Sequence, residues 1–284
     1  MNGIINAYKP SGISSAAAVG KIKHALGYGH IGHMGTLDPI GEGVLLVGVG
    51  KGARLFDHYL KKSKTYEASF AFGTCTDTLD ITGKITGTTG NIPAQSDIAL
   101  ALKRFIGTQE QLPPAYSAKS VGGVRAYELA RKGITAELKP SVITVGAFDL
   151  LRKTGENEYM FRIDCSAGTY IRSLCRDLAA GLGSLAVMTS IKRTRCGAFF
   201  AENSIKIEDI TPDIVIPLDV ALLDMPRYDA PDAAYKKIVN GVPYEADDAP
   251  DGEFTLYCRD ELIGIGVKSD RGIKTKTFLK GDLK

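Results

Sequence analysis

The 284-residue sequence has no tryptophan, four histidines, and five cysteines that form no Cys-x-x-Cys pair. Cysteines this sparse exclude a disulfide framework and a cysteine-rich zinc site, so we expect reduced thiols that are mostly buried. No apolar run reaches the ~18 residues that a membrane helix needs, and residues 1–5 lack the basic start and apolar stretch of a secretory signal. We therefore expect a protein of the cytoplasm that neither crosses a membrane nor holds a metal.

Charge is nearly balanced overall but unevenly distributed. The formal net charge is +3, and the 44% hydrophobic and 24% charged residues are ordinary for a globular protein. Residues 1–64 carry +5 and residues 103–199 carry +7, whereas residues 200–252 carry −8. Basic blocks suit a polyanion partner, because neutralising phosphates releases counterions. A solvated surface without a partner would give the same counts, so charge alone leaves both interpretations open.

Hydrophobic periodicity and turn residues predict interleaved helices and strands. Ser14 or Ser15 is suited to cap a helix that runs to Leu26 and stops at Gly27. Further helices are predicted at 98–106 (capped by Asp97), 125–132 and 169–180, and strands at 4–8, 44–49, 64–72, 142–151, 159–165 and 191–199. Because these elements follow no regular βαβ rhythm, we expect an α+β domain with a mixed central β-sheet flanked by helices.

The composition changes towards the C-terminus. Residues 212–231 are acidic and contain prolines, which predicts a connector. Beyond it, residues 254–258 and 262–267 have the pattern of two strands joined by a turn at Arg259-Asp260. The remaining length suffices for a small β domain. We therefore expect one domain over residues 1–227 and a second over residues 228–284.

Three familiar motifs fail in this sequence, one in its structural context and two in their residues. Residues 27–32 satisfy G-x-G-x-x-G, but a dinucleotide-binding loop must follow a strand and open a helix, whereas these residues follow a predicted helix. Gly50-Lys51-Gly52 lacks the earlier glycine and the Ser or Thr of a Walker A loop. The H-x-E and P-C-x-x-C pattern of zinc deaminases is absent. These mismatches disfavour a nicotinamide oxidoreductase and zinc-dependent chemistry on a base.

Asp38 ends a loop with glycines at positions 29, 32, 35, 41 and 43. Glycines let the backbone bend sharply and let a large planar ligand approach closely. An aspartate before Pro39 is either a turn residue that makes Asx hydrogen bonds or a catalytic carboxylate on a rigid loop. The residues alone favour the turn. His33, taken alone, is more often a structural hydrogen-bonding residue than a ligand contact.

Arg172 is an unusual residue for its predicted place. It falls with Tyr170 in the first turn of the 169–180 helix, where a cation is disfavoured by ~0.3–1 kcal/mol. A solvated helix face would tolerate this charge, and a nearby carboxylate would explain it. Tyr66 lies in a predicted strand and is by default a packed aromatic residue.

Six sequence blocks in a fixed order carry a resemblance to a known family. The chain resembles the TruB-type tRNA pseudouridine synthases over roughly residues 4–200. The blocks are Lys9-Pro10-Ser11-Gly12-Ile13-Ser14-Ser15 with residues 32–39, residues 64–68, residues 72–80, residues 113–119 with 125–128, residues 168–174, and residues 193–199. Any one block would be weak evidence, whereas six in register are specific.

The resemblance implies a role for individual residues. Asp38 matches the family's catalytic aspartate, Tyr66 the tyrosine that stacks on the target uracil, and Arg172 the arginine that pairs with the aspartate. His33 matches a histidine that helps to hold the extruded nucleotide. Tyr170 and Ile191 match further pocket contacts. The turn interpretation of Asp38 is thereby reversed.

The resemblance also implies the fold, the reaction and the partner. It implies a pseudouridine synthase fold with a small C-terminal PUA-like RNA-binding domain. No protein partner is implied, and we expect a monomer. The implied reaction converts the T-loop uridine of tRNA (position 55) to pseudouridine without a cofactor, and the T-arm stem-loop is the expected partner. Alternatives are a pseudouridine synthase acting on another RNA, and a non-catalytic RNA-binding or RNA-folding protein. The atom that Asp38 attacks stays open among uracil C6, ribose C1′ and a ribose proton.

Overall fold

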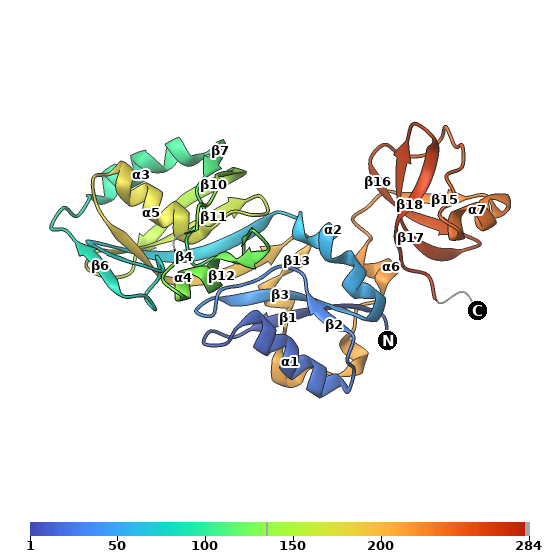
Figure 1. The fold of residues 1–284 in the computed structure, drawn as a ribbon, viewed down its shortest axis with the longest axis horizontal. Helices are drawn as coiled ribbons and strands as arrows, with labels where there is room; N and C mark the ends of the chain where they lie inside the picture. Colours follow the sequence, from blue (N-terminus) through green and yellow to red (C-terminus); the bar gives the residue numbers. More distant parts are fainter. Residues whose placement is uncertain (135, 282–284) are drawn as a thin grey trace.

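The computed structural model describes residues 1–134 and 136–281, and its larger part is built on one wide sheet (Figure 1). Ten strands form this sheet: β1 (Gly3–Lys9), β2 (Ile31–His33), β3 (Glu42–Val49), β4 (Lys64–Phe72), β7 (Gly107–Gln111), β10 (Ser141–Lys153), β11 (Glu158–Cys165), β12 (Ala186–Cys196), β13 (Phe199–Phe200) and β14 (Ile205–Lys206). Its main path is β14-β1-β3-β12-β4-β11-β10-β7, with β2 on β3 and β13 on β12. Parallel pairs (β1 with β14, β3 with β12) stand among antiparallel ones, which confirms the predicted mixed sheet.

Short helices accompany the sheet. The α-helices are α1 (Ser15–Leu26), α2 (Phe56–Leu60), α3 (Gln95–Leu102), α4 (Ala126–Arg131), α5 (Ile171–Gly181), α6 (Leu218–Ala221) and α7 (Tyr235–Val239), and the 3₁₀-helices are η1 (Gly50–Leu55), η2 (Lys103–Phe105), η3 (Ala201–Asn203), η4 (Ile207–Asp209), η5 (Pro212–Ile214) and η6 (Asp232–Ala234). The predicted limits of α1 are confirmed, because Ser14 accepts a hydrogen bond from the N–H of Ala17 and Gly27 ends the helix at φ +58. No helix in the described ranges is long and apolar enough to cross a membrane.

Other element boundaries differ from those predicted. Helix α3 begins at Gln95 after Ala94, so Asp97 lies in its first turn instead of capping it, and the last predicted turn is the 3₁₀-helix η2. A carboxylate within the first turn is as favourable as one at the cap. Strand β12 begins at Ala186 instead of Ile191, because residues 186–190 continue the ladder with β4. The five cysteines are all free and four are buried, as predicted.

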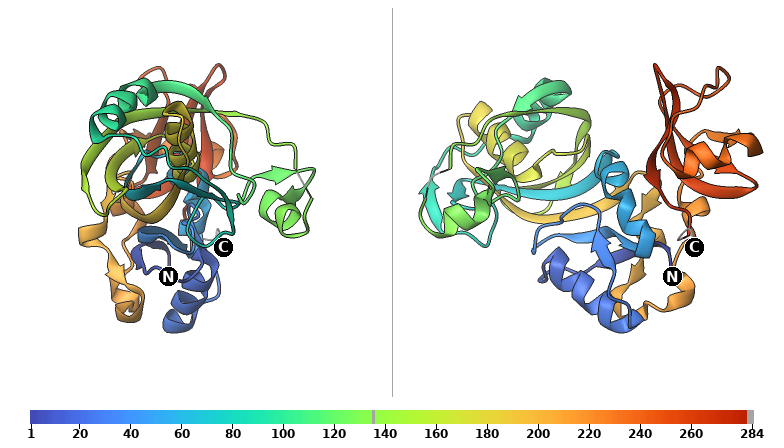
Figure 2. Two further views of the ribbon diagram at one scale, coloured as in Figure 1. Left: turned by 90° about the vertical axis from the view of Figure 1, so that its left-hand side faces the viewer. Right: turned by 45° about the vertical axis from the view of Figure 1, so that its right-hand side comes forward.

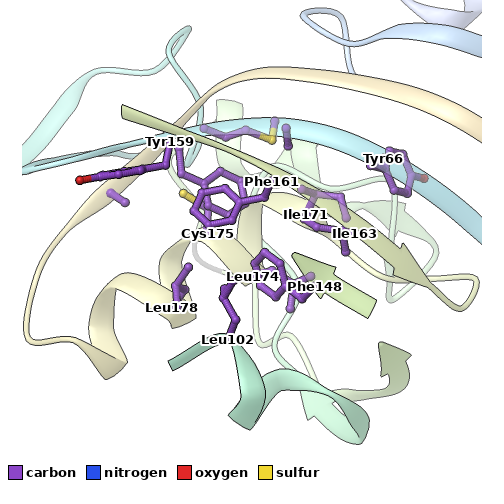
Figure 3. Packing of buried hydrophobic residues seen from close by; sticks show 14 of the residues in the cluster. Tyr66, Leu102, Phe148, Tyr159, Phe161, Ile163, Ile171, Leu174, Cys175 and Leu178 are labelled. Carbon is purple, nitrogen blue, oxygen red and sulfur yellow. The ribbon is translucent and has the colours of Figure 1, made fainter. Parts of the chain in front are cut away.

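Two hydrophobic cores lie against different halves of the sheet. One is formed by β4, β10, β11 and β12 with α3 and α5, and Figure 3 shows Phe148 and Phe161 packed near Leu174 of α5. The other is formed by β1 and β3 with α1. Strand β12 pairs with β3 on one side and with β4 on the other. This strand therefore joins the two halves.

A separate four-stranded sheet follows near the C-terminus (Figure 1, red). Its order is β15 (Arg227–Ala230), β16 (Glu253–Cys258), β17 (Glu261–Ser269), β18 (Gly272–Phe278). The predicted hairpin is confirmed, with Arg259 and Asp260 at φ +57 and +59 in the turn. Ile265 and Leu279 share a core with Leu55 and other residues of the larger part. A C-terminal β domain is thus present; its last expected residues, 282–284, lie outside the described ranges.

Two small hairpins extend from the body. One pairs β5 (Thr74–Thr76) with β6 (Ile85–Thr88), and the other pairs β8 (Ser120–Val121) with β9 (Val124–Arg125) just before α4. The β8–β9–α4 segment projects away from the large sheet (Figure 2, left, bright green).

Gly43 marks the closest approach of β3 and β12. It lies opposite Arg193 at φ +101, and a Cβ there would stand 2.3 Å from the Arg193 carbonyl oxygen. We predict that Gly43→Ala lowers the free energy of unfolding by about 1–3 kcal/mol or more. The alanine would have to adopt a left-handed backbone conformation, and its Cβ would clash with the Arg193 carbonyl. Gly20→Ala, inside α1 with no atom within 4 Å of the new Cβ, is the control and should stabilise by about 0.5–1 kcal/mol. Urea denaturation measures both, and an unchanged midpoint for Gly43→Ala would contradict the packing.

Candidate active site

The Asp38 loop lies between β2 and β3 and is held from one side by the chain around the start of α1. The Ser15 hydroxyl accepts from the Leu37 N–H at 2.9 Å and donates to the Leu37 carbonyl at 3.0 Å. The Gly12 N–H donates to the Pro39 carbonyl at 2.8 Å. The peptide groups on either side of Asp38 are therefore fixed, and the carboxylate projects from a rigid loop. The block of residues 9–15 and the block around Asp38 form one structural unit.

Lys9 supports the same loop through hydrogen bonds from its buried ammonium group. Its side chain is fully buried, and Nζ donates to the carbonyls of Ile13 at 2.7 Å, Pro10 at 2.9 Å and Pro39 at 3.4 Å. Burial lowers the pKa of Lys9 to about 8, and the nearby Asp38 carboxylate opposes that shift. The sequence interpretation treated this lysine only as part of a matching block and missed its role as a brace.

Asp38 meets Arg172 in a two-point ion pair. Arg172 lies in the first turn of α5 with only 6% of its surface exposed. Its Nε lies 2.9 Å from Asp38 Oδ2, and its Nη2 donates to Asp38 Oδ1 at 3.0 Å. The remaining N–H groups donate to the carbonyls of Thr78 at 2.9 Å and Tyr116 at 3.0 Å. The structure thus supplies the carboxylate that the position of Arg172 in the sequence called for.

A second carboxylate, that of Asp80, stands behind this pair. Its Oδ2 lies 3.7 Å from Nη1 of Arg172, and its Oδ1 accepts from the hydroxyls of Thr78 at 2.9 Å and Thr82 at 2.5 Å. The preceding residue, Leu79, has φ +64, an outlier for a bulky residue that often accompanies functional sites. Sequence reasoning did not single out Asp80, since nothing local places it near Arg172.

Tyr66 and Ile191 lie on neighbouring strands at one end of the larger core. Both are buried, and they belong to the same hydrophobic cluster as Leu37, the residue before Asp38. In Figure 3 the Tyr66 hydroxyl points away from the phenylalanines of that cluster. Burial raises the pKa of Tyr66 to about 12, opposed by a hydrogen bond and the positive charge of Arg193. Tyr66 therefore presents a neutral hydroxyl at neutral pH.

His33 ends β2 on the other half of the sheet. Its Nδ1 is buried and has no hydrogen-bond partner among the described residues. Burial lowers the pKa of His33, and the charge of Arg193 lowers it further. The ring is therefore neutral at pH 7, and one of its nitrogens is left for a ligand. An unpaired buried ring nitrogen is costly to retain, which favours a binding role over a structural one.

The backbone of Tyr170 is held by two hydrogen bonds with the side chain of Gln111. Gln111 of β7 accepts from the Tyr170 N–H at 2.8 Å and donates to the Tyr170 carbonyl at 3.0 Å. This clasp starts α5 at Ile171 rather than at the predicted Thr169. Burial raises the pKa of the Tyr170 hydroxyl, and the charges of Arg172 and Asp38 also act on it. Tyr170 is therefore a neighbour of the ion pair.

The structure brings Arg172 into contact with Asp38, and Tyr170 lies close enough for the charges of both to act on it. Tyr66 and His33 each lie near Arg193, and Ile191 shares a hydrophobic cluster with Tyr66. No group of three or more His, Cys, Asp or Glu side chains in the described residues is arranged to hold a metal ion. An ionised carboxylate aimed by an arginine, beside a neutral phenol, suits nucleophilic and proton-transfer chemistry.

The lowered pKa of Lys9 has a consequence for stability. Lysine in the unfolded chain keeps its proton up to about pH 10.5, whereas folded Lys9 releases it near pH 8. The unfolded state therefore binds more protons between these values, and stability rises with pH across that window. We predict that the melting temperature of the wild type, relative to that of Lys9→Met, increases from pH 7 to pH 9.5. A difference that stays constant with pH would show that the folded lysine titrates normally.

Comparison with known proteins places this geometry in a family. Residues 23–171 match the family model described as the N-terminal domain of the TruB family of pseudouridylate synthases. The chain is 38% identical over 290 residues to the tRNA pseudouridine synthase B of Clostridium novyi (strain NT), covering 98% of this chain and 100% of that one. It is 42% identical over 245 residues to the protein of the same name from Rickettsia bellii (strain OSU 85-389), covering 84% of each.

Solved structures agree on the fold. A chain in the crystal structure of a Cbf5-Nop10-Gar1 complex has a TM-score of 0.72 at 26% identity, covering 97% of this chain and 83% of that one. A chain in the structure of an H/ACA RNP bound to a substrate RNA containing 2′-deoxyuridine has a TM-score of 0.73 at 22% identity, covering 98% and 85%. Both likenesses extend over the large sheet and the C-terminal sheet. The chain therefore belongs to the TruB family of pseudouridylate synthases.

Proposed function

We propose that this protein isomerises the T-loop uridine of tRNA, at position 55, to pseudouridine, with Asp38 as the nucleophile. The observation that carries the proposal is the two-point contact of Arg172 with Asp38 on a braced loop. Relatives that match nearly the whole chain are named tRNA pseudouridine synthase B, which supports tRNA as the substrate. The six blocks shared with the family support the T-loop position.

The reaction makes few chemical demands. The bond from uracil N1 to ribose C1′ breaks, the base turns, and a bond from C1′ to C5 forms while C5 gives up a proton and N1 takes one up. Every atom of the nucleotide but that exchanged proton is kept, so the residues of the site are sufficient and no cofactor is invoked. Arg172 pairs with the Asp38 carboxylate and orients it. Attack at uracil C6, attack at ribose C1′ and removal of a ribose proton all start from this carboxylate.

The remaining site residues hold the nucleotide. A uridine in a folded T-loop must be extruded at a cost of a few kcal/mol, and stacking on Tyr66 returns about 1–3 kcal/mol. The neutral ring of His33 has a free nitrogen for a hydrogen bond. Tyr170 and Ile191 complete the pocket beside the ion pair. The phenol of Tyr66 is also a candidate to assist the transfer of the C5 proton.

The basic blocks, residues 1–64 and 103–199, bind the rest of the RNA through its phosphates. The projecting β8–β9–α4 segment carries Arg125 and Arg131 (Figure 2), which suit contacts with phosphates. Recognition by the shape of the T-arm stem-loop follows, because duplex RNA is read mainly by shape. We assign residues 1–227 to catalysis and residues 228–284 to additional RNA contact. The enzyme would act on the cytoplasmic tRNA pool as a monomer.

Asp38→Asn separates binding from chemistry. The amide keeps the size of the side chain but removes the nucleophile and half of the ion pair. We predict that this variant binds tRNA as the wild type does and forms no pseudouridine, measured as tritium released from C5-labelled tRNA. Asp77→Asn, on the nearby β5–β6 hairpin where Asp77 Oδ1 accepts from the Lys84 N–H at 2.8 Å, is a control and should keep full turnover. Unchanged turnover by Asp38→Asn would refute the nucleophile assignment.

The choice of uridine is tested with two transcripts. One carries the T-loop uridine and the other carries cytidine in its place, and both are labelled at C5 of every uridine. We predict tritium release from the first transcript only. Release from both would identify a pseudouridine synthase that acts on another uridine or another RNA. Tight binding without release from either would identify an RNA-binding or RNA-folding protein.

A further inference from the structure

Arg193 of β12 is a buried cation that donates hydrogen bonds to the Asp38 loop, whereas the other supports of this loop come from the chain around the start of α1. Only 2% of its surface is exposed. Its Nε donates to the Val44 carbonyl at 2.7 Å, its Nη1 to the Thr36 carbonyl at 3.3 Å and its Nη2 to the Gly35 carbonyl at 3.3 Å. It forms no ion pair with any carboxylate in residues 1–134 and 136–281. Retaining a buried charge without a carboxylate partner is costly, which calls for a function.

The strand positions of Arg193 put it at the seam between the two halves of the sheet. It lies opposite Gly43 of β3 in the parallel ladder and opposite Tyr66 of β4 in the antiparallel ladder. Gly43 lets the two backbones come so close that a Cβ would stand 2.3 Å from the Arg193 carbonyl. A single side chain therefore reaches the loop that carries Asp38 and the strand that carries Tyr66.

The loop depends on this contact at one point in particular. Leu37 and Pro39 are held by Ser15, Gly12 and Lys9. Among the described residues, the backbone carbonyls of Gly35 and Thr36 accept hydrogen bonds only from Arg193. These two residues precede Asp38 by three and two positions. Without the guanidinium, the loop is anchored only at Leu37 and Pro39.

We propose that Arg193 is a positioning residue, which holds Gly35 and Thr36 so that the Asp38 carboxylate has a single orientation. The inference rests on the proposed function of Asp38 and adds a residue to it. Because only 2% of Arg193 is exposed, its loss removes no side chain from the protein surface. Its loss slows the chemical step instead, since a displacement of about 1 Å in a reacting group costs roughly 10²-fold in rate.

The test compares Arg193→Met and Arg193→Lys with the wild type in single-turnover reactions. Enzyme is in excess over C5-tritiated tRNA at saturating concentration, and rate constant, amplitude and tRNA dissociation constant are measured. We expect Arg193→Met to lower the rate constant by about 10²-fold while amplitude and dissociation constant stay unchanged. Arg193→Lys should fall between, because an ammonium keeps the charge but does not match the fork of a guanidinium.

Arg195→Met is the matched control. Arg195 lies two residues further along β12, and its Nε donates to the Thr65 hydroxyl at 3.0 Å, away from the Asp38 loop. Its rate constant should equal that of the wild type. A purely structural role of Arg193 would instead lower melting temperature and amplitude and leave the rate constant at saturation unchanged, which overturns the proposal. If Arg193→Met does not fold, Arg193→Lys decides by the same criterion.

Failure of this inference is distinguishable from failure of the proposed function. An inactive Asp38→Asn together with a wild-type rate constant for Arg193→Met overturns only the role of Arg193. Turnover by Asp38→Asn, or no tritium release by the wild type, overturns the proposed function and the positioning role with it. A weaker dissociation constant as the sole effect of Arg193→Met would assign Arg193 to RNA binding and overturn positioning.

Discussion

The ion pair between Asp38 and Arg172 is the contact on which the site depends. It joins a loop of the β1–β3 half of the sheet to the first turn of α5, which packs on the other half. A buried arginine is tolerated because every direction of its guanidinium is matched, by Asp38 and Asp80 and by the Thr78 and Tyr116 carbonyls. Removing one partner of such a pair leaves an uncompensated charge and costs about 3–5 kcal/mol. The same pair therefore fixes the geometry of the site and the relative position of its two halves.

A rigid support is what such chemistry requires. Aspartate is a weak nucleophile that gains rate from orientation and from a site that excludes water. The loop around Asp38 is anchored by Lys9 and Ser15, which belong to the chain around the start of α1, and by Arg193 of β12. Strand β12 passes between the halves and carries both Arg193 and Ile191. The wide sheet thus holds the loop that carries the Asp38 carboxylate where its two halves meet.

Much of this frame could be predicted from the sequence. Local signals placed α1, with a cap at Ser14 or Ser15 and a stop at Gly27, and the two strands that form β10 and β11. The family resemblance named Asp38, Tyr66 and Arg172, whereas the residues alone favoured an ordinary turn at Asp38. The supports were missed because they depend on contacts between segments distant in sequence, as when Arg193 reaches Gly35. The start of α5 was misplaced for the same reason, since Gln111, 59 residues earlier, clasps the backbone of Tyr170.

The central claim is that this braced carboxylate acts on one uridine of the T-loop. The most direct measurement uses a tRNA tritiated only at C5 of that uridine and a second tRNA tritiated only at an anticodon-loop uridine. Each is incubated with the purified protein, and released tritium is counted. The proposed function predicts one equivalent released per molecule of the first tRNA and none from the second. Complete retention of the T-loop label by active, folded protein would contradict the claim.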